Sequence, residues 1–290
     1  MSAPNPNIHF KVLMTSGQTV KQPTANTIAI AGFGAIGQKV AERLNEGIDG
    51  LRLVAVSARN IDRVKAIVER FHSPVQVLPV EELGAVADVV IECAPAEIFM
   101  QIAEPTLKAG KTLLVISVGA LLVHPEVKDL ARQHGGRIVV PTGALLGLDA
   151  VQAAAEGTIN SVRMVSRKPP RGLENAPFLT EHQISITNLS EPLKLFEGNA
   201  REAVRGFPAN FNVAAALSLA GIGPDRTIIE IWADPTVTRN THTITVAGDS
   251  ADFSMTIENI PSENPKTGKI TALSVIAALR KLGSPIRIGT

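Results

Sequence analysis

The feature that most constrains this 290-residue chain is a glycine-rich turn between a strand-like run and a helix-like run. Residues 27–31 form a short apolar, β-branched stretch, and Gly32, Gly34 and Gly37 follow it in the spacing Gly-x-Gly-x-x-Gly. From Ile36 onwards apolar residues recur every four positions, as in a helix that packs on a sheet. Glycines at this spacing permit a tight turn, close approach of the backbone to a pyrophosphate, and close packing of helix on strand. The turn therefore predicts a dinucleotide site.

The start of the predicted helix supplies the groups that would bind the anion. A helix N-terminus presents backbone N–H groups without partners and the positive end of the helix dipole. The alternative is a glycine-rich turn with no ligand, and the strands and helices that follow the turn argue against it. We expect NAD or NADP to be bound by Gly32, Gly34, Ala35, Ile36 and Gly37.

Strand-like and helix-like segments alternate through the first half of the chain. Further strands are predicted by apolar runs at residues 51–56, 86–93, 112–117 and 137–140. Strands separated by amphipathic helices form right-handed βαβ crossovers, and hence a parallel sheet covered on both faces. We predict an α/β fold, a Rossmann doubly wound parallel sheet, over residues 27–146.

After Gly147 the pattern changes to strands joined by turns, with one strong helix at 208–220. The strands are predicted at residues 161–166, 193–197, 227–233, 242–247 and 252–258. This profile is typical of an α+β domain on a mostly antiparallel sheet, which we assign to residues 147–262. Residues 263–290 predict a C-terminal helix that returns to the first domain, and residues 1–26 an N-terminal extension.

Composition excludes several classes of protein. Lys plus Arg (28) and Asp plus Glu (27) leave a net charge of +1, too balanced for a protein that binds nucleic acid or anionic membranes. No run approaches the roughly 18 apolar residues of a membrane helix, and the first 26 residues lack the pattern of a secretory signal. The single cysteine, Cys93, fits a reducing compartment. We expect a cytoplasmic protein with a small-molecule substrate, and we assign no metal site.

The end of the second predicted strand bears on the choice of cofactor. An NAD-specific site usually has Asp or Glu about 20 residues after the glycine turn, to bind the ribose 2′-hydroxyl. This chain has Ser57, Ala58, Arg59 and Asn60 there, with no carboxylate. A hydroxyl and a guanidinium suit a 2′-phosphate, so Ser57 and Arg59 predict that NADP is accepted, along with NAD. The alternative is that Arg59 is a solvated residue at the start of the next helix.

His242 is the candidate acid or base, because histidine has the side-chain pKa nearest neutrality. The two-residue period of a strand puts Asn240, His242, Ile244 and Val246 on one face. His242 then begins an inward face just after a loop. The alternative is a core histidine satisfied by hydrogen bonds. The five other histidines are interpreted as surface or capping residues.

Other polar residues gain meaning only in combination. Arg167 and Lys168 end a predicted strand with two cations and could hold a dicarboxylate. Their alternative role is a charged loop start. Asn210 and Asn212 open a predicted helix, where such side chains either cap the helix or bind a ligand.

Taken together, six segments resemble the L-aspartate dehydrogenase family. They run in order along the chain at residues 31–37, 142–149, 166–170, 207–215, 233–242 and 258–267. The glycine turn is shared by many families, whereas the later segments, such as Glu-Asn-Ile-Pro-Ser-Glu-Asn-Pro-Lys-Thr at 258–267, are specific to this one.

The resemblance implies oxidation of L-aspartate to iminoaspartate by NAD or NADP, hydrolysis to oxaloacetate and ammonia, and the reverse reductive amination. His242 matches the active-site histidine of the family, and Ala144 matches a position that contacts the cofactor. A second cofactor contact falls on Asn212, with Asn210 as the alternative. We assign substrate binding to Arg167, Lys168, Asn210 and Asn240, and we expect a homodimer, since two-fold assemblies are the commonest.

Two other hypotheses about the function remain open. One is a different reductase on the same two-domain plan, of the homoserine or dihydrodipicolinate type. Sugar oxidoreductases of this plan carry Glu-Lys-Pro where this chain has Val118-Gly119-Ala120, which argues against them. The other is a non-enzymatic sensor that binds NADP and a partner protein, and that needs no histidine in its cleft.

Overall fold

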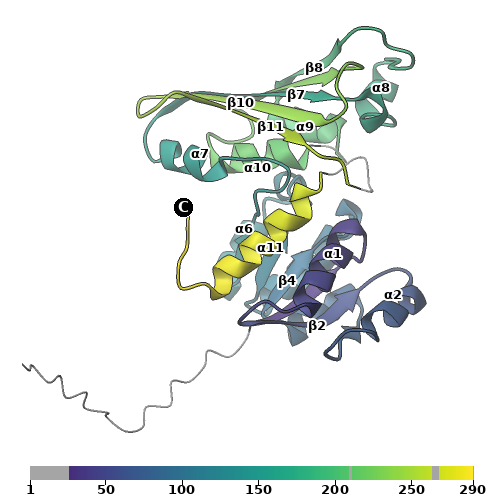
Figure 1. Cartoon of the computed structure of the whole chain (residues 1–290). Helices are drawn as coiled ribbons and strands as arrows, with labels where there is room; N and C mark the ends of the chain where they lie inside the picture. Colours follow the sequence, from purple (N-terminus) through teal and green to yellow (C-terminus); the bar gives the residue numbers. More distant parts are fainter. Residues whose placement is uncertain (1–25, 209–210, 263–267, 290) are drawn as a thin grey trace, which may run out of the picture.

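The computed structural model describes residues 26–208, 211–262 and 268–289, which form two units, each built around one sheet (Figure 1). Except for Asn26, which begins the first strand, the predicted N-terminal extension lies outside the described residues. None of the described helices is long and apolar enough to cross a membrane.

The first unit is a six-stranded parallel sheet with the strand order β3-β2-β1-β4-β5-β6. The strands are β1 (Asn26–Ala31), β2 (Leu51–Ser57), β3 (Gln76–Val77), β4 (Val89–Glu92), β5 (Thr112–Val115) and β6 (Arg137–Val139). This is the doubly wound order, and its topological switch point lies between β1 and β4. It confirms the predicted fold class.

Helices cover both faces of this sheet, so its strands are apolar without alternation. They are α1 (Ala35–Asn45), α2 (Ile61–Val68), α3 (Leu83–Val86), α4 (Phe99–Lys108), α5 (Ala120–Val123) and α6 (Val127–His134). On β1, Ile28 and Ile30 pack in the core that contains α1, whereas Ala29 and Ala31 pack in the core that contains α4. The strand predicted at 86–93 begins only at Val89, because Val86 is the last residue of α3 and Ala87 and Asp88 link this helix to the strand.

The second unit is a five-stranded mixed sheet with the order β11-β10-β7-β9-β8. Its strands are β7 (Ile159–Lys168), β8 (Leu193–Asn199), β9 (Thr227–Ala233), β10 (Asn240–Gly248) and β11 (Phe253–Asn259). β7 and β9 run parallel, and the other neighbouring pairs of this sheet run antiparallel. The expected mostly antiparallel sheet is therefore confirmed.

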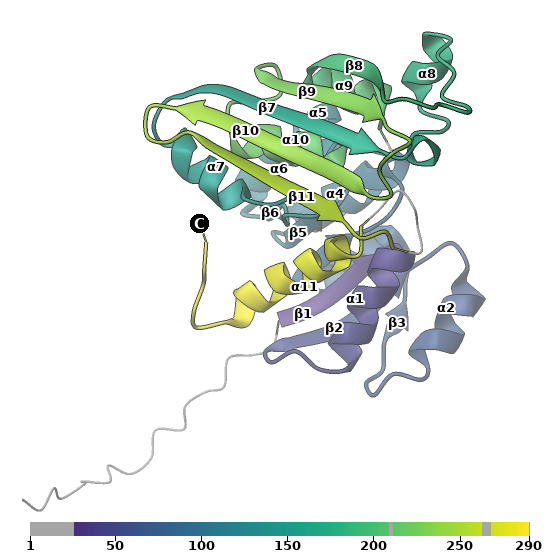
Figure 2. The same ribbon diagram turned by 45° about the horizontal axis from the view of Figure 1, so that its top comes forward.

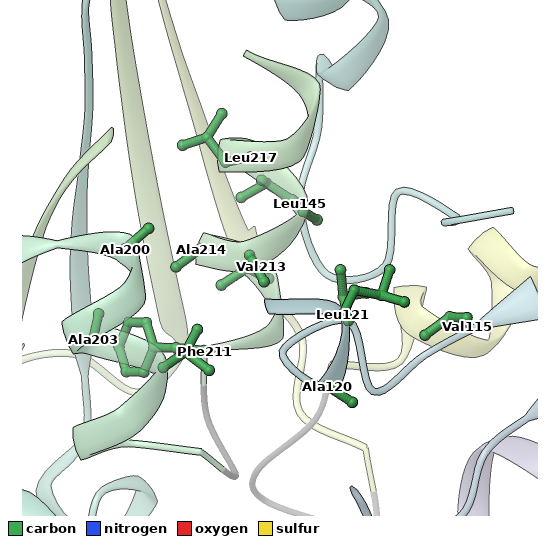
Figure 3. Close-up of a cluster of buried hydrophobic side chains, with 14 of the residues drawn as sticks. Val115, Ala120, Leu121, Leu145, Ala200, Ala203, Phe211, Val213, Ala214 and Leu217 are labelled. Atoms are coloured by element: carbon green, nitrogen blue, oxygen red, sulfur yellow. The ribbon is translucent and has the colours of Figure 1, made fainter. Parts of the chain in front are cut away.

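The helices of the second unit pack on the sheet face that is turned toward the first unit (Figures 1 and 2). They are α7 (Leu148–Ala155), α9 (Ala200–Gly206) and α10 (Asn212–Ala220), with the short α8 (Pro177–Glu181) at one end of the sheet. Figure 3 shows Val213, Ala214 and Leu217 of α10 in one apolar cluster with Leu121 of α5. The junction between the units is thus part of the hydrophobic core.

The last helix, α11 (Ile270–Gly283), lies against α1 of the first unit (Figure 1). Its buried residues Val275, Ile276 and Leu279 belong to the same core cluster as Ile28 and Ile30 of β1. The chain therefore crosses from the first sheet to the second and back, and α11 joins the two.

A methyl group at Gly37 tests the close packing of α1 on β1. The new Cβ would meet the carbonyl oxygen of Gly32. We expect Gly37→Ala to lower the free energy of unfolding by about 1–3 kcal/mol, because neither backbone segment can move away cheaply. Urea denaturation measures the change. Gly34→Ala is the matched control, because nothing lies within 4 Å of its added Cβ. Equal losses in the two variants would contradict the packing argument.

Candidate active site

A cavity lies at the junction of the two units, past the carboxyl ends of β5 and β6. The space between its walls, including the open space at its mouth, is about 670 Å³. The first unit contributes Ile36 of the glycine turn and the chain around Ile116 and Ala144. The second unit and its links contribute the polar side chains Lys168, Asn212, Asn240, His242, Asn259 and Thr271. Ile36, Ala144 and four polar residues singled out from the sequence thus meet here.

His242 lies on the inward face of β10 and is only 2% exposed. Its Nδ1 is 2.7 Å from the hydroxyl oxygen of Ser166, the residue directly across on β7. Burial, together with the nearby charge of Lys168, lowers the pKa of His242 to about 3. The imidazole is therefore neutral at pH 7. Because Ser166 engages Nδ1, Nε2 is the nitrogen left to exchange a proton with a ligand.

Lys168 follows Ser166 by two positions on β7, so both side chains point to the same face. It is 2% exposed, and its Nζ lies 4.9 Å from the ring centroid of Phe211. Burial lowers the pKa of Lys168 to about 7. Near neutral pH its charge is therefore easily changed, and an anion bound beside it would favour the protonated form.

The position of Arg167 differs from the one that its predicted role in substrate binding requires. The pleat of β7 turns it to the opposite face of the sheet from Lys168. There its Nη1 donates a hydrogen bond to Oδ2 of Asp234 at 3.0 Å, and its guanidinium lies 4.6 Å from the ring centroid of Trp232. Arg167 does not line the cavity. Its expected role in substrate binding is not supported, and Lys168 alone of the two cations is placed for that role.

The two positions that the resemblance assigns to cofactor contact are both held across the junction. Oδ1 of Asn212, at the start of α10, accepts a hydrogen bond of 2.9 Å from the backbone N–H of Gly119. The carbonyl oxygen of Ala144 accepts one of 3.0 Å from Nδ2 of Asn259. Asn240 lies on the cavity wall, and Asn210 lies outside the described residues. The cavity walls are thus tied together by backbone and amide groups of both units.

Glu92 is a residue of this region that sequence reasoning missed. Its fully buried carboxylate, at the end of β4, accepts hydrogen bonds from the backbone N–H groups of Ala94, Ile116 and Ser117 and from the Ser117 hydroxyl. Burial raises its pKa, although these hydrogen bonds oppose the shift. Glu92 fixes the chain that leaves β5 next to the cavity. The sequence signal that could have identified Glu92 is an acidic residue at the very end of an apolar strand.

The glycine turn has the shape that a dinucleotide needs. Gly32 has φ +98°, and a Cβ there would lie 2.6 Å from the Cys93 carbonyl oxygen, so the turn excludes a side chain. In front of Gly34 there is open space, and no side chain caps the N-terminus of α1. The first N–H groups of α1 are thus available to a pyrophosphate. At the end of β2, Ser57 is buried and Arg59 is exposed.

Two family models match the chain, one over each unit. Residues 32–141 match the NAD-binding domain of homoserine dehydrogenases, and residues 149–282 match the C-terminal domain of aspartate dehydrogenases. The fold, the open glycine turn and these matches define the class: the protein is an NAD(P)-dependent dehydrogenase with two domains.

Relatives along nearly the whole chain identify the family. The chain is 60% identical to the L-aspartate dehydrogenase of Bradyrhizobium diazoefficiens, covering 91% of this chain and 94% of that protein. It is 59% identical to L-aspartate dehydrogenase 3 of Bordetella bronchiseptica, covering 91% and 97%. The chain belongs to the L-aspartate dehydrogenase family, as the sequence motifs indicated.

Solved structures agree on the fold. The crystal structure of aspartate dehydrogenase from Thermotoga maritima superposes with a TM-score of 0.70 at 24% identity, covering 91% of this chain and 99% of that one. A homoserine dehydrogenase from Thiobacillus denitrificans gives a TM-score of 0.57 at 12% identity, covering 89% and 73%. The two-domain plan is therefore shared more widely than the family.

The buried state of His242 predicts a specific acid sensitivity. Because its folded pKa of about 3 lies below the ordinary 6.5, the unfolded chain binds the extra proton between these values. The stability that this difference provides is present above pH 6.5 and is lost as the pH falls toward 3. We expect His242→Gln to lose less of its free energy of unfolding than the wild type between pH 7 and pH 4, as measured by urea denaturation.

His134→Gln is the control, because His134 is exposed. Its replacement should leave the loss of free energy of unfolding between pH 7 and pH 4 as large as in the wild type. Parallel pH dependences for His242→Gln and the wild type would show that His242 is not buried in its neutral form.

Proposed function

We propose that this protein catalyses the NAD(P)-dependent oxidative deamination of L-aspartate to iminoaspartate, which hydrolyses to oxaloacetate and ammonia, and the reverse reductive amination. The observation that carries the proposal is the shared cavity, in which His242 and Lys168 of the second unit face Ile36 of the glycine turn. The relatives named L-aspartate dehydrogenase supply the substrate.

The charges of the cavity suit a dicarboxylate. Among the described residues that line it, Lys168 is the cation, and no Asp or Glu side chain stands on the wall. We assign one substrate carboxylate to Lys168 and polar contacts to Asn240, in place of the Arg167 that the sequence offered. A buried ammonium that meets a carboxylate makes a charge-assisted hydrogen bond, and such bonds are stronger than neutral ones.

His242 is assigned the proton transfers. Neutral at pH 7 and held by Ser166, it takes a proton from the substrate ammonium or from the water that attacks the imine. A pKa of about 3 makes the isolated imidazole a weak base. The two carboxylates of a bound substrate counteract the effect of Lys168 and raise that pKa toward the working range.

The cofactor is assigned to the open turn and the junction. The residues that would hold it are Gly32, Gly34, Ala35, Ile36, Gly37, Ala144 and Asn212. When bound, the cofactor would supply a nicotinamide ring as the acceptor of the hydride from the substrate α-carbon. Ser57 ends β2 and Arg59 follows it, with no carboxylate between them, so we propose that NADP is accepted along with NAD.

The direct test is the reductive reaction. We expect purified protein to oxidise NADPH or NADH, followed by absorbance, when both oxaloacetate and ammonium are present. Omitting ammonium, or replacing oxaloacetate by 2-oxoglutarate or pyruvate, should abolish most of the turnover. Arg59→Ala should lower kcat/KM for NADPH more than for NADH, because only NADPH offers a 2′-phosphate. Detectable NADPH binding without turnover would refute the aspartate activity and leave the dinucleotide site standing.

The roles of His242 and Lys168 separate in steady-state kinetics. We expect His242→Ala to lower kcat by about 10²–10⁴ with cofactor affinity preserved, since a general acid–base is lost. Lys168→Met should instead raise KM for aspartate by about 10- to 100-fold, the value of a hydrogen bond to a charged group.

Arg167→Met is the matched control for Lys168→Met, because Arg167 is the adjacent cation on the outer face and Asp234 keeps its hydrogen bonds from Thr236. Unchanged turnover in His242→Ala, or an equal rise in KM in the two methionine variants, would remove the corresponding assignment.

We also propose a cytoplasmic homodimer. The single cysteine suits a reducing compartment. The face of the second sheet opposite α7 and α10 carries no helix in the described part of the chain (Figures 1 and 2), and Val165, Ile228 and Trp232 are only partly buried there. A two-fold contact on this face would cover them. Sedimentation equilibrium decides between a dimer and a monomer.

A further inference from the structure

One buried acceptor in the cavity has no partner. Asn259 ends β11 and is 3% exposed. Among the described residues, its Oδ1 is the buried side-chain oxygen or nitrogen left without a hydrogen bond. Leaving such a buried group unpaired destabilises a protein, so a native site that keeps one needs an explanation.

The orientation of this amide follows from its other end. Nδ2 of Asn259 donates a 3.0 Å hydrogen bond to the carbonyl oxygen of Ala144. Turning the amide over would set two oxygens against each other, because a carbonyl can only accept. Oδ1 is therefore the unpaired atom, and it requires a donor.

The position of Asn259 indicates which ligand supplies that donor. A Cβ added to Gly268 would lie 2.8 Å from Oδ1, and Gly268 also borders the groove beside Ala35 and Ile36 at the start of α1. On its other side, Asn259 pairs across the sheet with Asn240, two residues before His242. The acceptor thus stands between the pyrophosphate end of the cavity and the histidine.

A dinucleotide bound with its pyrophosphate at the glycine turn and its nicotinamide ring near His242 would bring its nicotinamide riboside half to Asn259. This half carries the carboxamide N–H and ribose O–H donors. We propose that Oδ1 of Asn259 accepts a hydrogen bond from the nicotinamide riboside half of the cofactor. Asn259 then both binds the cofactor and holds the chain at Ala144 against it. The inference rests on the dinucleotide-binding part of the proposed function.

Two variants separate ligand binding from support of Ala144. Asn259→Leu and Asn259→Asp both lose the Nδ2 donor to Ala144, but only Asn259→Asp keeps an acceptor at the position. Binding is measured by calorimetry with no substrate present, so turnover is not needed. The probes are NAD, its 3-acetylpyridine analogue, which lacks the amide N–H, and ADP-ribose, which lacks the nicotinamide. Thermal melting verifies that each variant is folded.

If Oδ1 binds the carboxamide, the wild type and Asn259→Asp bind NAD about 5- to 100-fold more tightly than the acetylpyridine analogue, as expected for an acceptor left unpaired. Asn259→Leu then loses this preference. If Oδ1 binds a ribose hydroxyl, Asn259→Leu weakens NAD and ADP-ribose equally, and about 5- to 100-fold more than Asn259→Asp weakens them. Both results support the proposal.

Two results overturn it. The first is an equal loss for all probes in both variants, which indicates a purely structural Asn259. The second is unchanged binding in Asn259→Leu. Because the probes contain no amino acid, a failure of the aspartate activity leaves this test intact.

Discussion

The site depends on how the chain is held where it crosses from the first sheet to the second. The backbone N–H of Gly143 donates to the Ser274 hydroxyl of α11, and the Ala144 carbonyl accepts from Asn259 of β11. On the other side, Gly119 donates to Asn212 of α10. Each contact joins segments that are distant in the chain. Without them the two sheets would share an apolar interface but would not form a cavity of defined shape.

The electrostatics of the cavity follow from this enclosure. His242 and Lys168 are removed from water side by side, so burial lowers the pKa of both, and the charge of Lys168 lowers that of His242 further. Both shifts favour the uncharged forms of the two side chains. Under the proposed function, a bound dicarboxylate reverses the balance, because two negative charges stabilise the protonated forms. The proposal therefore couples substrate binding to proton uptake.

Sequence patterns were most informative about features that depend on a single turn, strand or helix. The glycine spacing and the apolar runs predicted the parallel sheet, and the two-residue period placed His242 on a buried face. The same period, applied to β7, separates Arg167 from Lys168, but it does not say which of them faces the cavity. That depends on which side of the sheet receives α7 and α10. The sequence analysis missed Glu92 for a related reason, since its partners Ile116 and Ser117 follow β5 and not its own strand.

The sequence by local interactions alone determines the order of turns, strands and helices, because glycine conformation, strand pleat and helix period depend on near neighbours along the chain. Family motifs extended this to Ala144, Asn212 and His242. Tertiary structure decided three other features. They are the unpaired oxygen of Asn259, the buried carboxylate of Glu92 and the lowered pKa of Lys168. Their properties come from desolvation and from hydrogen bonds between segments far apart in sequence, and both exist only once the two sheets and α11 have packed together.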